Sequence, residues 1–233
     1  QVKSSILLAG LAAGVGIKII EPVQTRDHTE RMLKHFGANI EITSQGSKNV
    51  IQLSSFNNLQ AQDYKVVGDI SSAAFLIVGA LISNSPGLEI TNVGMNPSRT
   101  GVLDALKKMG ANIEVKNQRL ESGEPCADLE VKESVLRGVE LSGDIIPNII
   151  DEIPVISIAA AFAEGETVIR DAAELRVKES DRLKAVSDGF RSLGVVHKNF
   201  DDGMCISGSP DTLSIDQSAT VQSHDDHRIA MSF

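Results

Sequence analysis

The sequence has no tryptophan, a single tyrosine and only 3% aromatic residues. A core without large rings has to be built from Ile, Val, Leu and Ala, and the hydrophobic content of 42% is sufficient for one. The two cysteines, Cys126 and Cys205, do not have a zinc-binding spacing. We interpret them as reduced residues, which predicts a cytoplasmic protein.

The sequence also has no excess of basic residues, since its net charge is −9. This balance argues against broad non-specific binding to nucleic acid or to an anionic membrane surface, although a local cationic cleft remains compatible with it. No segment is long and apolar enough to span a bilayer, and no secretory signal is visible. The chain lacks an initial Met and starts and stops within apolar helical patterns, so we expect it to be part of a longer protein.

A repeat organises the chain. Three similar segments read as the end of an amphipathic helix, a glycine and then a strand: RMLKHFGANIEI, DALKKMGANIEV and RSLGVVHK. Gly37, Gly110 and Gly194 fit the position just after a helix, where the backbone turns left-handed. An apolar helix and a strand precede each segment, and a further strand, such as DYKVVGD, leads into the next apolar helix. The predicted fold class is α/β, made of β-α-β-α-β-β units with buried apolar helices.

Polar residues gather at two repeated places, the turns into the apolar helices and the turns into the amphipathic helices. Helix N-termini carry free N–H groups and attract anions, so cations gathered there could form an anion site. The first set of turns lies at 68–72, 148–154 and 224–228, and the second at 25–30, 96–101 and 177–182.

The turn VKESDR has two interpretations. Ser180 is a plausible helix cap with Asp181 in the first turn, which would be a structural role. Lys178 and Arg182 repel each other at a helix start unless an anion or a carboxylate compensates them. Glu179 could pair with them or carry a proton.

Two further turns remain ambiguous in the same way. Asp151 precedes an apolar segment, where it could cap the helix before Pro154 or act as a general base at the mouth of a cleft. In HDDHR, His224 and His227 could ligate a metal, but capping by Asp225 or Asp226 is the stronger interpretation. Arg228 opposes the dipole of its helix there, so an anionic ligand would explain it.

The turn TRDHTE is interpreted similarly. Arg26 precedes a predicted capped helix, and His28 and Glu30 are predicted to be surface residues of its first turn. No phosphate-binding glycine loop or nucleophile elbow is present.

The stretches LRVKESDRL, DHRIAMSF, QVKSSILLAGL and GDISSAAF resemble 5-enolpyruvylshikimate-3-phosphate (EPSP) synthase, and the resemblance runs from residue 1 to residue 233. RDHTE is similar to the bacterial class II type, noted for glyphosate insensitivity, although Ser98 stands where that class tends to have Thr. The resemblance implies a two-domain enolpyruvyl transferase fold. Residues 1–66 would complete the first domain and residues 68–233 would form most of the second.

The resemblance also implies a reaction of the shikimate pathway. The enolpyruvyl group of phosphoenolpyruvate would be added to the 5-hydroxyl of shikimate 3-phosphate and phosphate released, without metal or organic cofactor, in an enzyme expected to be a monomer. Asp151 would take the hydroxyl proton and Glu179 would handle the proton of the methylene carbon. The remaining implied roles are substrate contacts: Arg182 and Arg228 for phosphoenolpyruvate, and Gln1, Arg26 and Lys178 for shikimate 3-phosphate.

Three alternatives stay open. A UDP-N-acetylglucosamine enolpyruvyl transferase shares the fold and the donor but lacks the KESDR run. A metal-dependent hydrolase would use HDDH. The chain alone could also be an inactive fragment that acts only as a folding or binding module.

Overall fold

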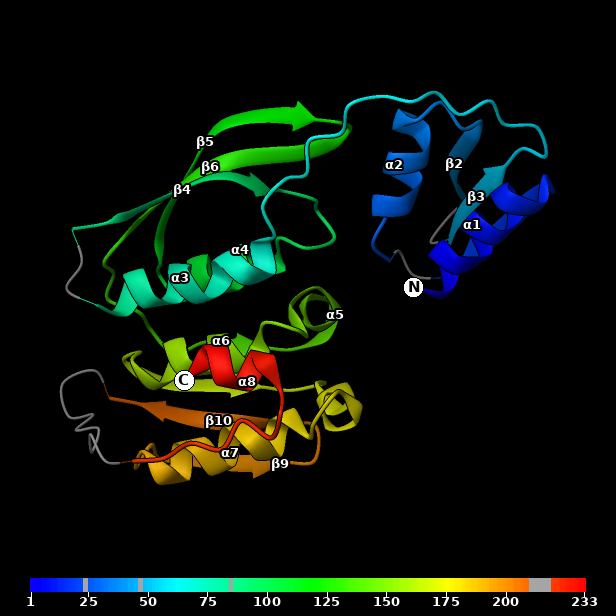
Figure 1. Cartoon of the computed structure of the whole chain (residues 1–233). Coiled ribbons are helices and arrows are strands. Elements are labelled where there is room, and N and C mark those ends of the chain that lie inside the picture. The colour runs from blue at the N-terminus through cyan, green and yellow to red at the C-terminus, as the bar shows by residue number, and fades with distance from the viewer. Residues whose placement is uncertain (23–24, 46–47, 84–85, 210–218) are drawn as a thin grey trace. The chain divides into compact units, whose positions relative to one another are not determined.

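The computed structural model describes residues 1–22, 25–45, 48–83, 86–209 and 219–233. These residues form two compact units, whose elements are labelled in Figure 1. The first unit is Gln1–Val67 with the short pieces Gly94–Ser98 and Gln118–Cys126; the second is Gly68–Val93, Arg99–Asn117 and Ala127–Phe233. Among the described residues, no helix has the length and apolar character needed to cross a membrane.

The first unit consists of two helices and a three-stranded sheet. Its elements are α1 (Val2–Ala13), β1 (Ile17–Glu21), α2 (His28–His35), β2 (Ile40–Gln45) and β3 (Lys48–Leu53). The strand order is β1-β3-β2, and β3 pairs antiparallel with both neighbours. A small core joins α1, α2 and this sheet through Leu7, Leu33 and Ile51.

The elements from α3 onward form a longer series. They are α3 (Ile70–Ile82), β4 (Leu88–Gly94), α4 (Gly101–Lys108), β5 (Asn112–Glu121), β6 (Glu124–Lys132), β7 (Glu140–Leu141), η1 (Gly143–Ile145), α5 (Ile146–Ile149), α6 (Ile153–Ala161), β8 (Gly165–Ile169), η2 (Ala173–Val177), α7 (Arg182–Ser192), β9 (His197–Phe200), β10 (Gly203–Gly208) and α8 (His227–Ser232). Within this series α6 is central, because it packs against α3, α4, α7, α8 and β10.

The sheets confirm the repeat. The strand orders are β1-β3-β2, β4-β6-β5 and β7-β8-β10-β9, so the first strand after each apolar helix always pairs with the last strand of its unit. Gly37, Gly110 and Gly194 all have positive φ, at 86°, 96° and 72°, directly after a helix C-cap. The α/β fold class and the left-handed helix ends are therefore both confirmed.

Two predictions about the repeat are wrong in part. The segment DYKVVGD does not form a strand; only Gly68 makes an isolated parallel bridge, to Val93, and the residues before it are mostly exposed. The apolar helices α3 and α6 are buried as predicted, but α1 is not. It packs against β1, β3 and α2, and this leaves Val2, Ile6 and Leu8 exposed.

Candidate active site

Arg182, the first residue of α7, lies at the centre of a buried charge cluster in the second unit. Each of its guanidinium nitrogens donates to a carboxylate: Nε to Asp226 at 2.8 Å, Nη1 to Asp151 at 3.3 Å and Nη2 to Glu179 at 2.6 Å. The side chain of Arg182 is only 2% exposed, whereas that of Glu179 is 58% exposed. One cation therefore binds three acids, of which Glu179 is the most exposed.

The local sequence explains how Arg182 is held at the helix start. Asp181 is the N-cap of α7, because its Oδ1 accepts the backbone N–H of Lys184 at 3.0 Å. The predicted cap, Ser180, is wrong by one residue; its hydroxyl donates to Asp226 at 3.0 Å instead. Capping by Asp181 leaves Ser180 available to strengthen the Arg182–Asp226 contact.

Asp151 lies in the turn between α5 and α6, where it meets two cations. Besides Arg182, Lys178 approaches its Oδ1 at 3.8 Å, while Lys178 also bonds Glu174 at 2.6 Å. The predicted capping role is wrong, because the N-cap position of α6 belongs to Glu152 and has no side-chain cap bond. Pro154 stands at the start of α6 without an N–H to donate, so a cap has one fewer group to satisfy.

Arg228 belongs to α8 and faces a different acid. Its Nη1 donates to Glu152 Oε1 at 3.3 Å, and its side chain is 14% exposed. Asp226 is the N-cap of α8, since it accepts the backbone N–H of Arg228 at 2.8 Å, which confirms the capping interpretation of HDDHR. Asp226 thus fixes Arg182 through its side chain and the start of α8 at the same time.

The two most buried acids of this cluster have opposite pKa shifts. Burial alone would raise the pKa of Asp226, but hydrogen bonds from Arg182, the Arg228 N–H and Ser180 outweigh it and hold that pKa below its usual range. Burial raises the pKa of Glu152 above its usual value, even though Ser71 and Arg228 oppose the shift. The cluster therefore contains one acid that is firmly ionised and one that is reluctant to be.

The other predicted substrate residues, Gln1 and Arg26, belong to the first unit and are described within it alone. Gln1 is the exposed N-cap of α1 without a side-chain cap bond, and Arg26 is exposed just before α2. Near them Lys3 is buried and bonds Glu30 at 2.5 Å and Glu21 at 3.1 Å. Glu30 is therefore a core residue, and its predicted surface position is wrong because Lys3 neutralises it.

The predicted capped start of α2 is also wrong in its detail. Asp27 occupies the N-cap position, but its side chain makes no cap bond. It bonds Arg31 at 2.9 Å and accepts from Asn96 at 2.6 Å. The carboxylate is thus used by side chains rather than by the helix terminus.

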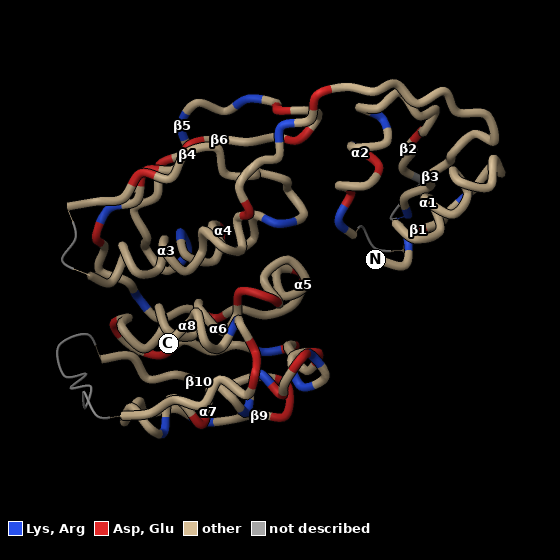
Figure 2. The backbone as a smooth tube through the Cα atoms, viewed as in Figure 1, with Lys and Arg blue, Asp and Glu red and all other residues tan. Residues whose placement is uncertain are grey.

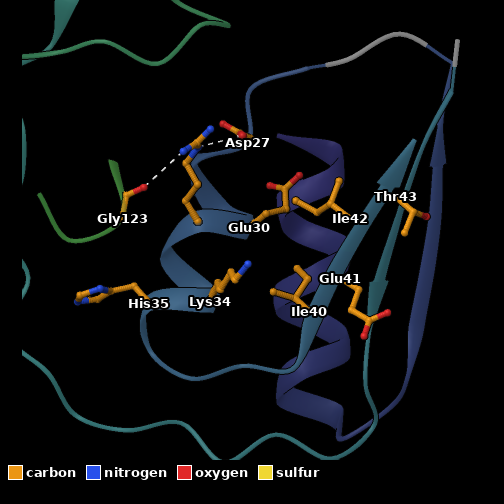
Figure 3. Close-up of a pocket in the computed structure, with 10 residues that line it drawn as sticks. Asp27, Glu30, Lys34, His35, Ile40, Glu41, Ile42, Thr43 and Gly123 are labelled. Atoms are coloured by element: carbon orange, nitrogen blue, oxygen red, sulfur yellow. Dashed lines mark hydrogen bonds and ion pairs between the residues drawn. The ribbon is translucent and has the colours of Figure 1, made fainter. Parts of the chain in front are cut away.

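A pocket in the first unit lies between α2 and β2 (Figure 3). Arg31, on its wall, bonds Asp27 and also the Gly123 carbonyl at 3.4 Å. None of the seven predicted site residues lines this pocket. We therefore place the candidate chemistry at the Arg182 cluster, where charged groups converge, and not at this hollow.

Metal binding by HDDH finds no support in the described part of the chain, which contains no group of three or more His, Cys, Asp or Glu that could hold an ion. His224 and His227 are both exposed, and Asp226 between them is committed to Arg182 and α8.

The structure thus brings together Asp151, Lys178, Glu179, Arg182 and Arg228, from turns far apart in the sequence. Figure 2 shows acidic and basic positions mixed in the turn that leads into α7, whereas the charged positions of the turn into α6 are acidic. Sequence reasoning missed Glu152 as a partner of Arg228. The signal that could have found it is an acid placed directly before a wholly apolar helix, where it has to be buried or paired.

Known proteins are similar to the whole of this chain. A family model described as EPSP synthase (3-phosphoshikimate 1-carboxyvinyltransferase) matches residues 1–233. A 3-phosphoshikimate 1-carboxyvinyltransferase of Magnetococcus marinus is 50% identical over 232 residues, and one of Geobacter sulfurreducens is 49% identical over 232 residues. These matches cover 100% of this chain but 51% and 52% of those proteins, so the chain spans about half the length of the curated relatives it matches.

Solved structures agree with this likeness. An EPSP synthase from Acinetobacter baumannii superposes with a TM-score of 0.89 at 46% identity, over 99% of this chain and 52% of that one. The enolpyruvyl transferase NikO from Streptomyces tendae superposes with a TM-score of 0.65 at 20% identity, over 87% of this chain and 44% of that one. The second likeness shows the fold alone, and both show an enolpyruvyl transferase fold.

Proposed function

The chain belongs to the EPSP synthase family, and from this premise we propose that the whole protein transfers the enolpyruvyl group of phosphoenolpyruvate to the 5-hydroxyl of shikimate 3-phosphate. Addition of the hydroxyl oxygen to C2 and of a proton to C3 gives a tetrahedral intermediate. Loss of that proton and of phosphate then gives the enol ether. The observation that carries the proposal is the meeting of Asp151, Lys178, Glu179 and Arg182 in the second unit, to which Asp226 joins Arg228.

The chemistry of this cluster supports the assignment of roles. Both substrates are multiply anionic, and arginine binds phosphate and carboxylate through two parallel N–H bonds. Asp151 lies beside Lys178 and Arg182 at the start of a helix, and we assign its carboxylate as the base that accepts the 5-hydroxyl proton. Glu179 is exposed enough to change partners, which suits a group that moves a proton to and from C3.

Gln1, Arg26 and Lys178 are proposed to bind shikimate 3-phosphate. Arg26 and Lys178 supply positive charge for its phosphate, and Gln1 supplies an amide for its hydroxyl groups. We also propose that residues 1–66 and 68–233 belong to two different domains, that the whole protein is a cytoplasmic monomer, and that it works without a cofactor. Light scattering of the purified whole protein tests the monomer.

The competing acceptor is UDP-N-acetylglucosamine, and the family match does not favour it. The assay that decides is phosphate release by the whole protein from phosphoenolpyruvate with either acceptor. We expect release with shikimate 3-phosphate and none with the nucleotide sugar. Release with the nucleotide sugar alone would refute the proposed function.

The chain itself is expected to be inactive when expressed as residues 1–233, because it spans about half the length of its relatives. The same phosphate-release assay tests this. Turnover by residues 1–233 alone would show that the segment contains a complete site.

A further inference from the structure

A row of polar side chains that the proposed reaction does not use leads to Arg228 and is buried in its middle. It crosses the starts of α3, α4, α6 and α8 within the second unit. Arg99 Nη2 donates to Asp69 at 2.8 Å and to the hydroxyl of Ser71 at 2.6 Å. Ser71 in turn donates to Glu152 Oε1 at 2.5 Å, and the same oxygen accepts from Arg228 at 3.3 Å. Charges thus alternate along the row and end at a predicted substrate-binding arginine.

The middle of the row is the least exposed part. The Glu152 side chain is 3% exposed, and Ser71, in the first turn of α3, is also buried. Burying a carboxylate is costly unless it is hydrogen-bonded and paired, and burial does raise the pKa of Glu152. The burial of the Glu152 carboxylate therefore has to be explained by the groups that it binds.

What Glu152 holds is the guanidinium of Arg228. Among the described residues, Glu152 is the one hydrogen-bond partner of the Arg228 guanidinium, whereas Arg182 donates to three carboxylates. A long side chain with one anchor keeps its other N–H groups available to a ligand while its direction is fixed. Ser71 and Arg99 fix the anchor itself.

We propose that Glu152 is a positioning residue that aims Arg228 at the phosphate or carboxylate of phosphoenolpyruvate, and that Ser71 and Arg99 hold Glu152 in place. The proposal rests on the proposed function of the whole protein. It goes beyond it in assigning a role to three residues, Ser71, Arg99 and Glu152, to which the proposed reaction gives none.

The experiment uses the whole protein with Glu152→Gln. Glutamine keeps the length and an acceptor for Ser71 but removes the charge that holds Arg228. We expect the KM for phosphoenolpyruvate to rise about tenfold, the difference between a charged and a neutral hydrogen bond. The KM for shikimate 3-phosphate and kcat should stay within about twofold, because Glu152 touches neither the acceptor nor the reacting atoms.

A matched control separates this effect from the loss of any carboxylate. Glu164 is an exposed glutamate that approaches Arg137 at 3.8 Å, and Glu164→Gln should leave all three kinetic constants unchanged. Ser71→Ala is the second variant, because it leaves every charge in place and removes only the hydroxyl between Arg99 and Glu152. It should raise the KM for phosphoenolpyruvate about threefold, in line with one neutral hydrogen bond.

A double variant tests whether Glu152 acts through Arg228. If it does, Glu152→Gln with Arg228→Lys should be no worse for phosphoenolpyruvate than Arg228→Lys alone. Additive effects would overturn the proposal, as would an unchanged KM in Glu152→Gln. If Glu152→Gln does not fold, the same comparison with Ser71→Ala decides.

Failure of the proposed function can be told apart from failure of this inference. Side-chain NMR of the whole protein labelled with 15N-arginine, with Arg228→Lys to assign the resonance, reports the order of the Arg228 guanidinium without any turnover. We expect a restricted guanidinium that becomes mobile in Glu152→Gln. An Arg228 signal equally mobile in both proteins would overturn the positioning role, even if the wild-type protein were active.

Discussion

Arg182 and Arg228 are both arginines at a helix start and both are assigned to phosphoenolpyruvate, but their surroundings differ. Arg182 is 2% exposed and donates to Asp151, Glu179 and Asp226, whereas Arg228 is 14% exposed and its guanidinium bonds Glu152. A guanidinium surrounded by three acids is part of the framework. A guanidinium with one anchor has N–H groups to offer, so the two arginines should differ in how much of their role is structural.

This difference also affects how an anion could reach Arg182. Asp226 is fully buried and caps α8, and Asp151 is shared with Lys178, so neither is easily displaced. Glu179 is 58% exposed and holds Nη2 alone apart from a longer contact of that nitrogen to Asp226 at 3.4 Å. The acid that we assign to proton transfer is therefore also the one that a substrate carboxylate would replace on Arg182.

The largest expected effect is on stability, from Asp226→Asn. Asparagine can still cap α8, but Arg182 then loses its buried partner. Removing one member of a buried ion pair costs about 3–5 kcal/mol. Urea denaturation of the whole protein measures this loss, and a change below about 1 kcal/mol would show that Asp151 and Glu179 suffice for Arg182.

The next largest effect is on turnover, from Asp151→Asn. Asparagine keeps the shape but cannot take up the hydroxyl proton, so kcat should fall about a hundredfold or more, which is about 2.7 kcal/mol. Because Asp151 is not a helix cap and Arg182 keeps two other acids, the free energy of unfolding should change by about 1 kcal/mol or less. Near-normal kcat, after correction for the folded fraction, would limit Asp151 to charge balance.

Arg-to-Lys changes at the two positions should give different signatures. Lysine keeps the charge but not the planar fork. Arg182→Lys should lower the free energy of unfolding by about 2–3 kcal/mol, since charged hydrogen bonds to three carboxylates are disturbed. Arg228→Lys should leave stability within about 1 kcal/mol and lower kcat/KM for phosphoenolpyruvate about ten- to a hundredfold. Melting curves and steady-state kinetics on the same samples make the comparison, and identical profiles would contradict it.

The sequence was informative where one local rule decides the outcome. The glycines that end helices could be predicted, because glycine readily adopts the left-handed backbone conformation found there. The burial of the apolar helices α3 and α6 could be predicted from their composition. The exposure of α1 could not be predicted, because an apolar composition favours burial but does not specify which element covers the helix. Burial depends on neighbours that composition does not specify.

The candidate site was predictable in its members but not in its pairings. Lys178, Glu179 and Arg182 lie within one turn, so their proximity follows from the sequence. The pairing of Arg228 with Glu152 and of Arg182 with Asp226 joins residues far apart in the chain. Capping was one of the interpretations of Ser180 and of Asp151, because each precedes a helix, but Asp181 is the cap of α7 and Glu152 occupies the N-cap position of α6.

A smaller effect follows from the opposite pKa shifts of Glu152 and Asp226. The pKa of Glu152 is raised by burial, so its contribution to stability is present below its unfolded pKa and is lost as pH rises through the folded value. Glu152→Gln should therefore be as stable as the wild type near pH 4 and equal or more stable at neutral pH. The deficit of Asp226→Asn should be full above the ordinary pKa of 3.8 and shrink as pH falls below it, because the folded pKa is lowered. Denaturation curves across this pH range decide, and parallel pH profiles for the two variants would be inconsistent with the shifts.

The smallest effect is expected at Asp188, an acid with two basic partners, more than the one ion pair of either buried acid, Asp226 or Glu152. On α7 it bonds Lys184 and also Arg191 at 2.7 Å, but all three side chains reach solvent. Exposed pairs of this kind contribute about 0.5 kcal/mol each at most, because water already solvates both charges. Asp188→Asn should therefore change the free energy of unfolding by about 1 kcal/mol or less and leave turnover unchanged. A loss as large as that of Asp226→Asn in the same denaturation experiment would mean that the number of ion pairs, and not the burial of the carboxylate, determines stability along this helix.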